Sequence, residues 1–407
     1  MVRFPTISTF LLSHLSRKTT SGRFIREIDG LRFISIAMVI MTHLRYFLDK
    51  ESQAPYAGTL RTNWLAEAAN RGYYGVELFF VISGFILALP FAVYHLKRSR
   101  PVSLKQYFLR RVTRLEPPYI LVITLFFVLR VLISDEGGVT ELLPHYFASL
   151  FYLHNLIYMR HSDILSVAWS LEIEVQFYLL APILALLFSI PKRALRRGVI
   201  GGIAVLSILL QGFFIPRTSP LYLTLANYIQ FFLMGFILAD VYLVDWKEHP
   251  VFHWKWDFLP PVILSVILLG WIPRPYWSLA FPFLILLFFY AAFRSVAVRS
   301  IIINPWITTI GGMCYTIYLI HAPLITYIGK GVRRIGFNGH FSIDFLILSL
   351  GAVPIVLALS FGFFALVERP CMEKDWPYRL YGKVRATGST PAKEPLTGRT
   401  LKMENQV

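Results

Sequence analysis

The sequence predicts an all-α integral membrane protein with about ten transmembrane helices and both termini in the cytoplasm. Of its 407 residues, 56% are hydrophobic and 15% are charged, whereas soluble domains carry about 25% charged residues. The mean hydropathy is +0.58. Apolar runs of about the length that spans a bilayer recur along the chain. We therefore expect most of the chain to lie in a lipid bilayer.

The net charge of +17 does not indicate nucleic-acid binding, because the lysines and arginines lie mainly in short segments between apolar runs. The segments 97–114 and 191–197 (PKRALRR) are the most basic of these. Short basic segments between spans remain on the cytoplasmic side. These two segments therefore place the N-terminus in the cytoplasm. The two cysteines, Cys314 and Cys371, predict neither a disulfide framework nor a metal site.

The apolar runs divide the chain into three parts. Residues 1–26 form a cytoplasmic, partly disordered lead, residues 27–370 a transmembrane domain, and residues 371–407 a polar, disordered cytoplasmic tail. The expected spans are about 28–47, 74–94, 117–133, 166–190, 198–215, 221–243, 258–272, 277–293, 306–329 and 343–367. The run 142–158 is short for a span and contains prolines and histidines, so we interpret it as re-entrant or interfacial.

The first span carries two ionisable residues, Arg32 near its start and His43 near its end. At about 100° per residue the two return to nearly the same helical face, roughly 16 Å apart along the axis. Ionisable groups inside a membrane usually face a protein interior or a water-filled cavity, and they mark functional sites. The alternative for His43 is a structural histidine bonded to a backbone carbonyl of a neighbouring helix.

Three further places break the apolar pattern. The sequence RRVTRLEPPY contains Arg110, Arg111 and Arg114, which either bind phosphate groups through their guanidinium forks or simply obey the positive-inside rule. Glu172 and Glu174 begin the fourth span and differ by about 200° around a helix, so at most one faces an interior site. His321 lies alone in the ninth span, where a structural role is more common than a catalytic one.

These stretches together resemble the acyltransferase 3 family of integral-membrane acyltransferases. The resemblance rests on Arg32 and His43 with ten residues between them, on GV(D/E)LFFxxSGF at Gly75–Phe85, on RRxxRLxPxY at Arg110–Tyr119, on WSLxxExxFY at Trp169–Tyr178 and on YxxYLxHxPL at Tyr315–Leu324. Two positions depart from the usual pattern. Val175 replaces the second of two adjacent glutamates, and Glu77 stands where aspartate is commoner.

The resemblance implies transfer of an acyl group, most commonly acetyl, from cytoplasmic acyl-CoA to a hydroxyl group of a saccharide or glycosylated acceptor. It implies no metal, and a bacterial-type inner or plasma membrane. His43 is the expected general base, Arg32 and Glu174 are expected to assist it, and Arg110, Arg111 and Arg114 are expected to bind the phosphates of CoA. The further candidate site residues are Glu77, Ser83, Tyr119, Trp169, Ser170 and His321.

A proton-coupled transporter of a saccharide or an acylated substrate is the rival interpretation, since intramembrane histidine, glutamate and arginine also form proton relays. Transporters more often show two symmetrical halves, and we find no internal repeat. A purely structural membrane protein would leave Arg32 and His43 unexplained.

Overall fold

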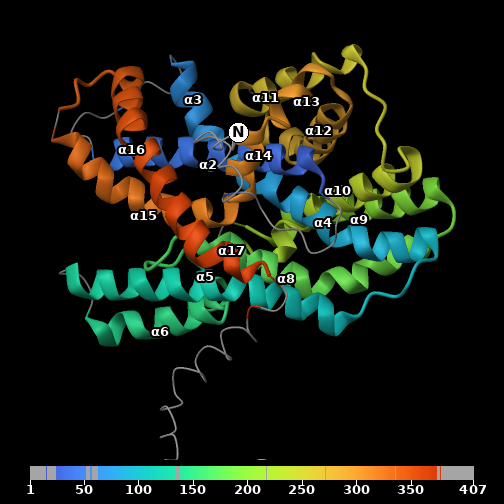
Figure 1. Ribbon diagram of the computed structural model, residues 1–407, viewed down its shortest axis with the longest axis horizontal. Helices are drawn as coiled ribbons and strands as arrows, with labels where there is room; N and C mark the ends of the chain where they lie inside the picture. The colour runs from blue at the N-terminus through green and yellow to red at the C-terminus, as the bar shows by residue number, and fades with distance from the viewer. Residues whose placement is uncertain are drawn as a thin grey trace, which may run out of the picture.

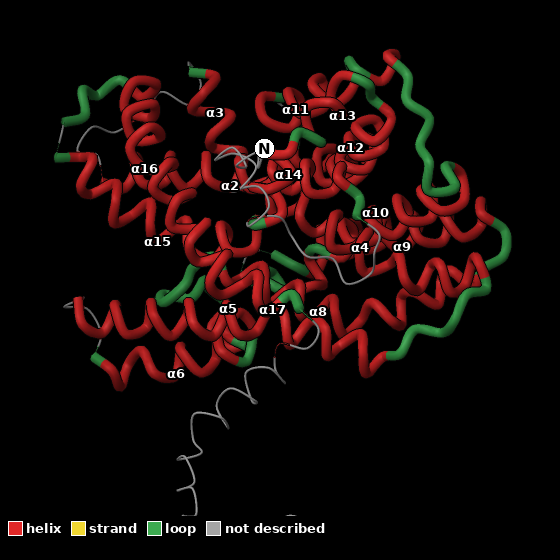
Figure 2. Tube along the Cα trace, in the orientation of Figure 1, coloured by secondary structure: helices red, strands yellow, loops and turns green. Residues whose placement is uncertain are grey.

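The computed structural model describes residues 24–51, 63–133, 138–216, 218–270, 272–334 and 336–373, together with the single residues Leu15, Tyr56 and Trp376. Within these residues the regular elements are helices and none is a strand (Figure 2). The predicted all-α fold is thereby confirmed. Most of the predicted lead (1–26) and tail (371–407) lies outside the described residues.

The long helices and the shorter helices between them follow one another along the chain (Figure 1). They are α2 (Arg26–Glu51), α3 (Trp64–Arg71), α4 (Gly75–Lys97), α5 (Leu104–Ile133), α6 (Val139–Leu150), α7 (His154–Tyr158), α8 (Ala168–Leu184), α9 (Arg193–Phe214), α10 (Ile229–Asp240), α11 (Leu259–Leu269), α12 (Arg274–Arg294), α13 (Ala297–Ile302), α14 (Pro305–Gly312), α15 (Cys314–Arg333), α16 (Phe341–Phe363) and α17 (Arg369–Cys371).

Helix α2 lies in the middle of the molecule (Figure 1) and contacts α3, α4, α13, α14, α15 and α16. Two of these contacts are close because a glycine replaces a side chain. A Cβ on Gly30 would meet the backbone oxygen of Ile302, and one on Gly311 would meet that of Asp29. Small residues at helix crossings are the usual means of close packing inside a membrane. The first span is therefore surrounded by protein along much of its length.

Helices α4 and α10 pack along each other through a pair of glycines. A Cβ on Gly84 would lie 2.2 Å from the backbone oxygen of Phe232, and one on Gly235 would lie 2.3 Å from that of Val81. Aromatic rings fill the space around this crossing; the rings of Phe80 and Phe232, for example, stack at 4.7 Å. The glycine of the SGF sequence thus serves helix packing.

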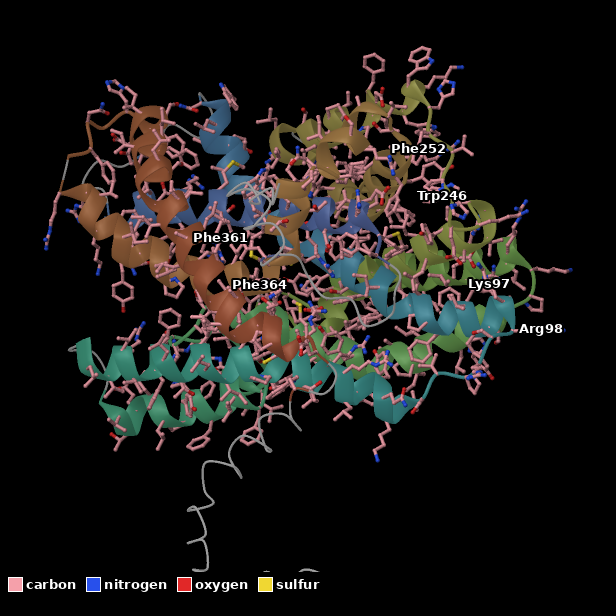
Figure 3. All side chains as sticks on the ribbon, viewed as in Figure 1. Lys97, Arg98, Trp246, Phe252, Phe361 and Phe364 are labelled. Atoms are coloured by element: carbon pink, nitrogen blue, oxygen red, sulfur yellow. The ribbon has the colours of Figure 1, made fainter. Side chains whose placement is uncertain are left out.

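The basic ends of several helices meet at one end of the molecule. Lys97, where α4 ends (Figure 3), pairs with Glu248 at 2.5 Å, and Arg197 of α9 pairs with Asp245 at 2.8 Å. Both acidic residues follow α10. The two basic segments that the sequence assigns to the cytoplasm therefore lie on the same side of the fold.

Seven described helical stretches are long and apolar enough to cross a membrane. They are Arg26–Lys50, Trp64–Lys97, Leu104–Leu132, Ala168–Ser189, Arg193–Gly212, Tyr276–Arg294 and Phe341–Cys371. Three of the about ten expected spans, those at 221–243, 258–272 and 306–329, are not among them. The run 142–158 forms α6 and α7, and its re-entrant or interfacial position stays a prediction.

The three remaining runs are not long apolar helices, because two of their helices are short and the third run is divided into two helices. Helix α10 begins only at Ile229 and has 12 residues, about 18 Å, which is short of the roughly 30 Å hydrocarbon core. Helix α11 has 11 residues. The run 306–329 divides at Met313 into α14 and α15, and the tyrosines, His321 and Lys330 make α15 less apolar than the seven long stretches.

The third span also differs from its predicted form. It was expected to start near Pro117 after a basic loop, but α5 begins at Leu104 and continues through Pro117 and Pro118. The three candidate arginines therefore lie within a helix, about two turns from its N-terminal end.

We expect Gly84→Ala to destabilise the fold by about 1–3 kcal/mol, because the added methyl group would overlap the backbone of α10. Gly201→Ala in α9 is the matched control, since a Cβ there has open space around it. It should be neutral or stabilising by up to about 1 kcal/mol. Thermal unfolding of the purified variants in detergent measures both. Equal melting temperatures for the two variants would contradict the proposed close contact.

Candidate active site

Helix α15 connects several of the sequence stretches singled out above. The Tyr315 hydroxyl donates to a backbone carbonyl of α5 at 2.8 Å. The Tyr318 and Ser170 hydroxyls, on α15 and α8, lie 2.6 Å apart. Nε2 of His321 lies 3.2 Å from Nδ1 of His43 on α2. The three α15 residues are spaced three apart, so they form one row along the helix. Stretches far apart in the sequence therefore meet at this row.

The hydrogen bonds of the two histidines define their tautomers. Nδ1 of His321 lies 3.0 and 2.8 Å from the backbone oxygens of Ile317 and Tyr318. Because carbonyl oxygens only accept, this Nδ1 carries the hydrogen, and Nε2 of a neutral His321 is an acceptor. Nδ1 of His43, 2.9 Å from the oxygen of Val39, must then donate to both Val39 and His321. The remaining nitrogen of His43, Nε2, is left with a free lone pair.

This arrangement changes the interpretation of His321. The sequence favoured a structural role for an isolated histidine, but the structure places its ring 4.6 Å from that of His43, edge to face. His321 is fully buried and His43 is half-buried. His321 can therefore fix the orientation and tautomer of His43, while Nε2 of His43 has no hydrogen-bond partner in the described part of the chain.

Arg32 has a different partner from His43. Its Nη1 lies 2.5 Å from Oδ1 of Asp29, one turn earlier on α2, and Glu174 on α8 adds a longer-range attraction. As the predicted separation along the helix implies, no hydrogen bond joins Arg32 to His43. Arg32 can supply positive charge beside Glu174, but it does not orient the imidazole directly.

Glu174 connects α8 with α4. The Ser83 hydroxyl donates to Oε1 of Glu174 at 2.5 Å, and Tyr178, one turn further along α8, interacts electrostatically with this carboxylate. Glu174 thus has a hydroxyl partner on another helix and positive charge from Arg32 and Arg111 nearby. The serine of the SGF sequence belongs to this network.

Glu172 faces elsewhere, as its angular offset predicts. Its Oε2 accepts from the backbone amide of Asn155 at 2.8 Å. Glu172 therefore holds the start of α7 against α8. Of the two glutamates, only Glu174 contacts other candidate site residues.

The three arginines of α5 occupy three different environments. The guanidinium of Arg111 lies 3.8 Å above the Tyr107 ring, which is a cation–π contact. Arg114 lies 3.9 Å from Glu368. Arg110 is exposed and has no ion-pair partner among the described residues. The i, i+4 spacing of Arg110 and Arg114 predicts that they point the same way on a helix, but Arg114 is drawn inward by the buried carboxylate of Glu368.

Glu368 is a residue that the sequence reasoning missed. It directly follows the last expected span, 343–367, yet it is fully buried in a π-helical turn after α16, together with Phe364 (Figure 3). The backbone amide and hydroxyl of Thr316 donate to it at 3.1 and 2.6 Å. The only signal in the sequence is that Glu368 directly follows an apolar run. An acidic residue in that position can equally mark the end of a helix, so the sequence does not predict that Glu368 is buried.

Three other candidates belong to packing or to a separate group. Tyr119 is fully buried and its hydroxyl donates to the backbone oxygen of Ser149 at 2.7 Å, so it ties α5 to α6. Trp169 lies beside Tyr228, with ring centroids 5.4 Å apart. Glu77 is buried in the first turn of α4.

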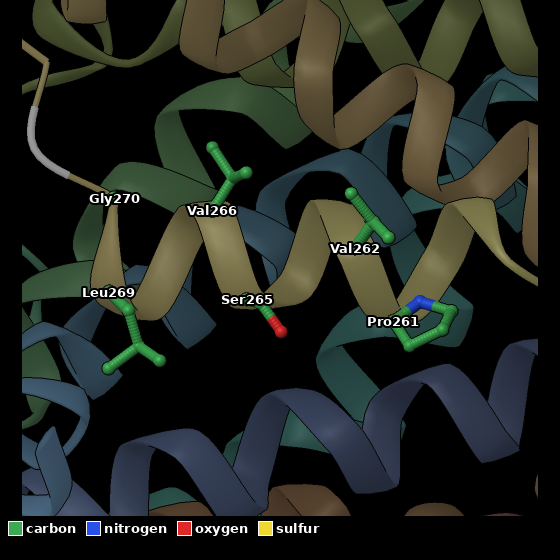
Figure 4. Close-up of a pocket in the computed structure, with 6 residues that line it drawn as sticks. All are labelled: Pro261, Val262, Ser265, Val266, Leu269 and Gly270. Atoms are coloured by element: carbon green, nitrogen blue, oxygen red, sulfur yellow. The ribbon is translucent and has the colours of Figure 1, made fainter.

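A shallow groove runs along α11 (Figure 4) and contains one hydroxyl group and otherwise apolar or backbone surface. Its lining residues are Pro261, Val262, Ser265, Val266, Leu269 and Gly270. No titratable side chain lines it, so it offers no acid–base chemistry. Among the described residues, no group of three or more His, Cys, Asp or Glu side chains is arranged to hold a metal ion.

Comparison with known proteins identifies related chains. A family model described as an acyltransferase domain matches residues 25–366. The O-acetyltransferase OatA of Staphylococcus aureus strain NCTC 8325 is 23% identical over 401 aligned residues, which cover 88% of this chain and 59% of that protein. A protein of strain COL, provisionally named O-acetyltransferase SACOL0978, is 26% identical over 349 residues, covering 75% and 51%.

The chain therefore spans 59% and 51% of the length of these two relatives. No solved structure matches the chain significantly.

The free lone pair on His43 predicts selective modification by diethyl pyrocarbonate, which reacts with accessible, unprotonated imidazole nitrogens. His43 should be modified well before His321, whose ring is buried and whose Nδ1 is hydrogen-bonded. Peptide mass mapping measures this, with exposed His340 as the positive control. Modification of His321 before His43 would show that the assigned arrangement of the pair is wrong.

Proposed function

Since the chain belongs to the acyltransferase 3 family, we propose that it transfers an acyl group, with acetyl expected, from acyl-CoA to a hydroxyl group of a saccharide or glycosylated acceptor. The observation that carries this proposal is the histidine pair, because it leaves His43 with one unprotonated nitrogen and a fixed orientation. A general base for a hydroxyl group needs both properties.

In the proposed reaction, Nε2 of His43 takes the proton from the acceptor hydroxyl as its oxygen attacks the thioester carbonyl. The tetrahedral intermediate collapses, the carbon–sulfur bond breaks and the acyl ester forms. The imidazolium of His43 returns the proton to the departing thiolate of CoA. His321 acts as a positioning residue, since its Nε2 accepts from Nδ1–H of His43 and favours the imidazolium as it forms.

Arg32 and Glu174 are proposed to set the electrostatics between the donor and His43. Arg32 is held by Asp29 and attracted by Glu174, so its charge is fixed in place before any substrate binds. A fixed positive charge near a developing oxyanion lowers the reaction barrier. The hydroxyl group of Ser83 holds Glu174 by a hydrogen bond.

The three arginines of α5 are proposed to bind the phosphate groups of acyl-CoA at the basic end of the molecule. Arg111 and Arg114 are held by Tyr107 and Glu368, so they contribute fixed positive charge. Arg110 has an exposed guanidinium that can form the direct, bidentate contact with phosphate. The donor would then enter from the cytoplasm, while His43 lies towards the other end of α2.

We further propose that the protein resides in a bacterial-type inner membrane and modifies a polysaccharide or a related glycan. The S. aureus relatives are named O-acetyltransferases, and the basic ends of α4 and α9 lie together, as expected of a cytoplasmic face.

Replacing His43 by Ala should lower acyl transfer by about 10²- to 10⁴-fold, the usual contribution of a general base. His321→Ala should cost less, and His321→Gln should recover part of the loss because its carbonyl oxygen can still accept from His43. Transfer of radiolabelled acetyl groups from acetyl-CoA, or from longer acyl-CoAs, into a membrane glycan fraction measures this at matched expression.

Equal transfer by the His43→Ala variant and the original chain would remove His43 from the chemistry. No transfer by any variant, from any donor, would overturn the proposed function and favour the transporter interpretation.

Replacing Arg110 by Ala should raise the KM for acetyl-CoA about tenfold with little change in kcat, since a hydrogen bond between charged groups is worth about 1.5–3 kcal/mol. Arg193→Ala is the control, because Arg193 lies at the same basic end but pairs with Asp245. Initial rates over a range of donor concentrations give both constants. An unchanged KM for Arg110→Ala would exclude this residue from donor binding.

A further inference from the structure

Three buried polar atoms without hydrogen bonds lie around Trp169 and Tyr228. They are Oε2 of Glu77, Oδ1 of Asn155 and Nε2 of Gln176. All the other such atoms in the described chain are Nε atoms of arginines or belong to Asp29 and Glu368, whose carboxylates have the partners given above. Buried polar groups are nearly always paired, so a group of unpaired ones calls for an explanation.

Contacts with the aromatic pair place the three side chains in one region. Glu77 lies one turn from Phe80 on α4 and interacts electrostatically with Tyr228, whose ring is 5.5 Å from that of Phe80. The amide nitrogen of Asn155 donates to the backbone oxygen of Trp169 at 2.8 Å.

Gln176 lies two turns along α8 from Trp169, on the same helical face. Its side-chain oxygen accepts from the backbone amide of Leu225 at 2.8 Å, in the short helix that leads to Tyr228. Its amide nitrogen therefore has no hydrogen-bond partner and lies near the same two aromatic residues, Trp169 and Tyr228.

The group lies next to the histidine pair. Ser170 follows Trp169 and bonds to Tyr318 at 2.6 Å, and Tyr318 is one turn from His321. Glu77 also interacts electrostatically with Tyr318. Since Glu77 and Trp169 stand near the N-terminal ends of α4 and α8, the group is on the side of the molecule away from the basic ends of these helices.

We propose that Glu77, Asn155 and Gln176 form an acceptor subsite that binds the hydroxyl groups of a sugar, with the sugar ring packed against Trp169. This proposal rests on the proposed function and names the part of the site that holds the acceptor. A hydroxyl group both donates and accepts, so it pairs with the two unpaired acceptors, Glu77 and Asn155, and with the unpaired donor, Gln176. The side chain of Trp169 is half-buried, and its indole N–H has no partner among the described residues.

The chemistry of the group favours a sugar over an apolar or an anionic acceptor. An apolar acceptor would leave all three polar atoms unpaired, which is costly in a buried site. An anionic acceptor would have to leave water without a cationic partner among these three side chains. Small-molecule binding sites are usually lined by aromatic side chains and a small number of precisely positioned polar groups.

Two isosteric variants test the subsite. Glu77→Gln replaces one acceptor oxygen by a donor, and Gln176→Glu removes the unpaired donor while keeping the oxygen that accepts from Leu225. Each should raise the KM for a solubilised membrane glycan fraction about tenfold or more, with the KM for acetyl-CoA unchanged. Glu141→Gln, which alters an exposed carboxylate on α6, is the matched control and should change neither constant.

A lower kcat with an unchanged KM for the glycan would overturn the proposal. So would Glu77→Gln and Gln176→Glu variants that, like Glu141→Gln, leave both KM values unchanged. Melting temperatures of the purified proteins show whether each variant folds.

Glycan binding without acyl-CoA separates this proposal from the proposed function. The glycan fraction should raise the melting temperature of the original chain and of Glu141→Gln, but not that of Glu77→Gln. If the original chain transfers no acyl group and still shows this pattern, the subsite is supported and the proposed function fails. No stabilisation of the original chain, or equal stabilisation of Glu77→Gln, would reject the subsite.

Discussion

Polar side chains on helices inside a bilayer need hydrogen-bond partners, and the bonds that they form between helices organise the centre of the protein. Tyr315, Tyr318 and His321 of α15 reach α5, α8 and α2 in turn. Ser83 of α4 completes the set through Glu174 of α8. Each of these bonds joins two of the sequence stretches that resemble the acyltransferase 3 family. The same contacts that hold the helices together therefore gather the candidate chemical groups.

The candidate site has two distinct sides, which suits the proposed reaction between a cytoplasmic donor and an acceptor on the opposite side. Glu174 attracts both Arg32 and Arg111, and these three residues lie towards the basic end. His43, His321 and the unpaired groups around Trp169 lie towards the other. Glu174 interacts with Tyr318 as well as with the arginines, so it stands between the two sides.

Close packing between helix backbones supports this arrangement. Gly30, Gly84, Gly235 and Gly311 let backbones approach where any side chain would overlap a carbonyl oxygen. Helix α2 is held in this way against α14, and α4 against α10. The polar groups on α2 and α4 are consequently presented from fixed backbones, which is the condition for a preorganised site.

The sequence by itself determined the helical class, the membrane location and most of the candidate residues, because hydropathy, charge placement and residue type are local properties. It also separated Glu172 from Glu174 and Arg32 from His43, since angular offset and rise follow from helix geometry alone. Only the tertiary structure decided that His321 contacts His43, that Glu368 is buried and that Arg110 and Arg114 differ. These depend on which helices are neighbours, and that choice is made by side-chain packing between segments as far apart as α2 and α15.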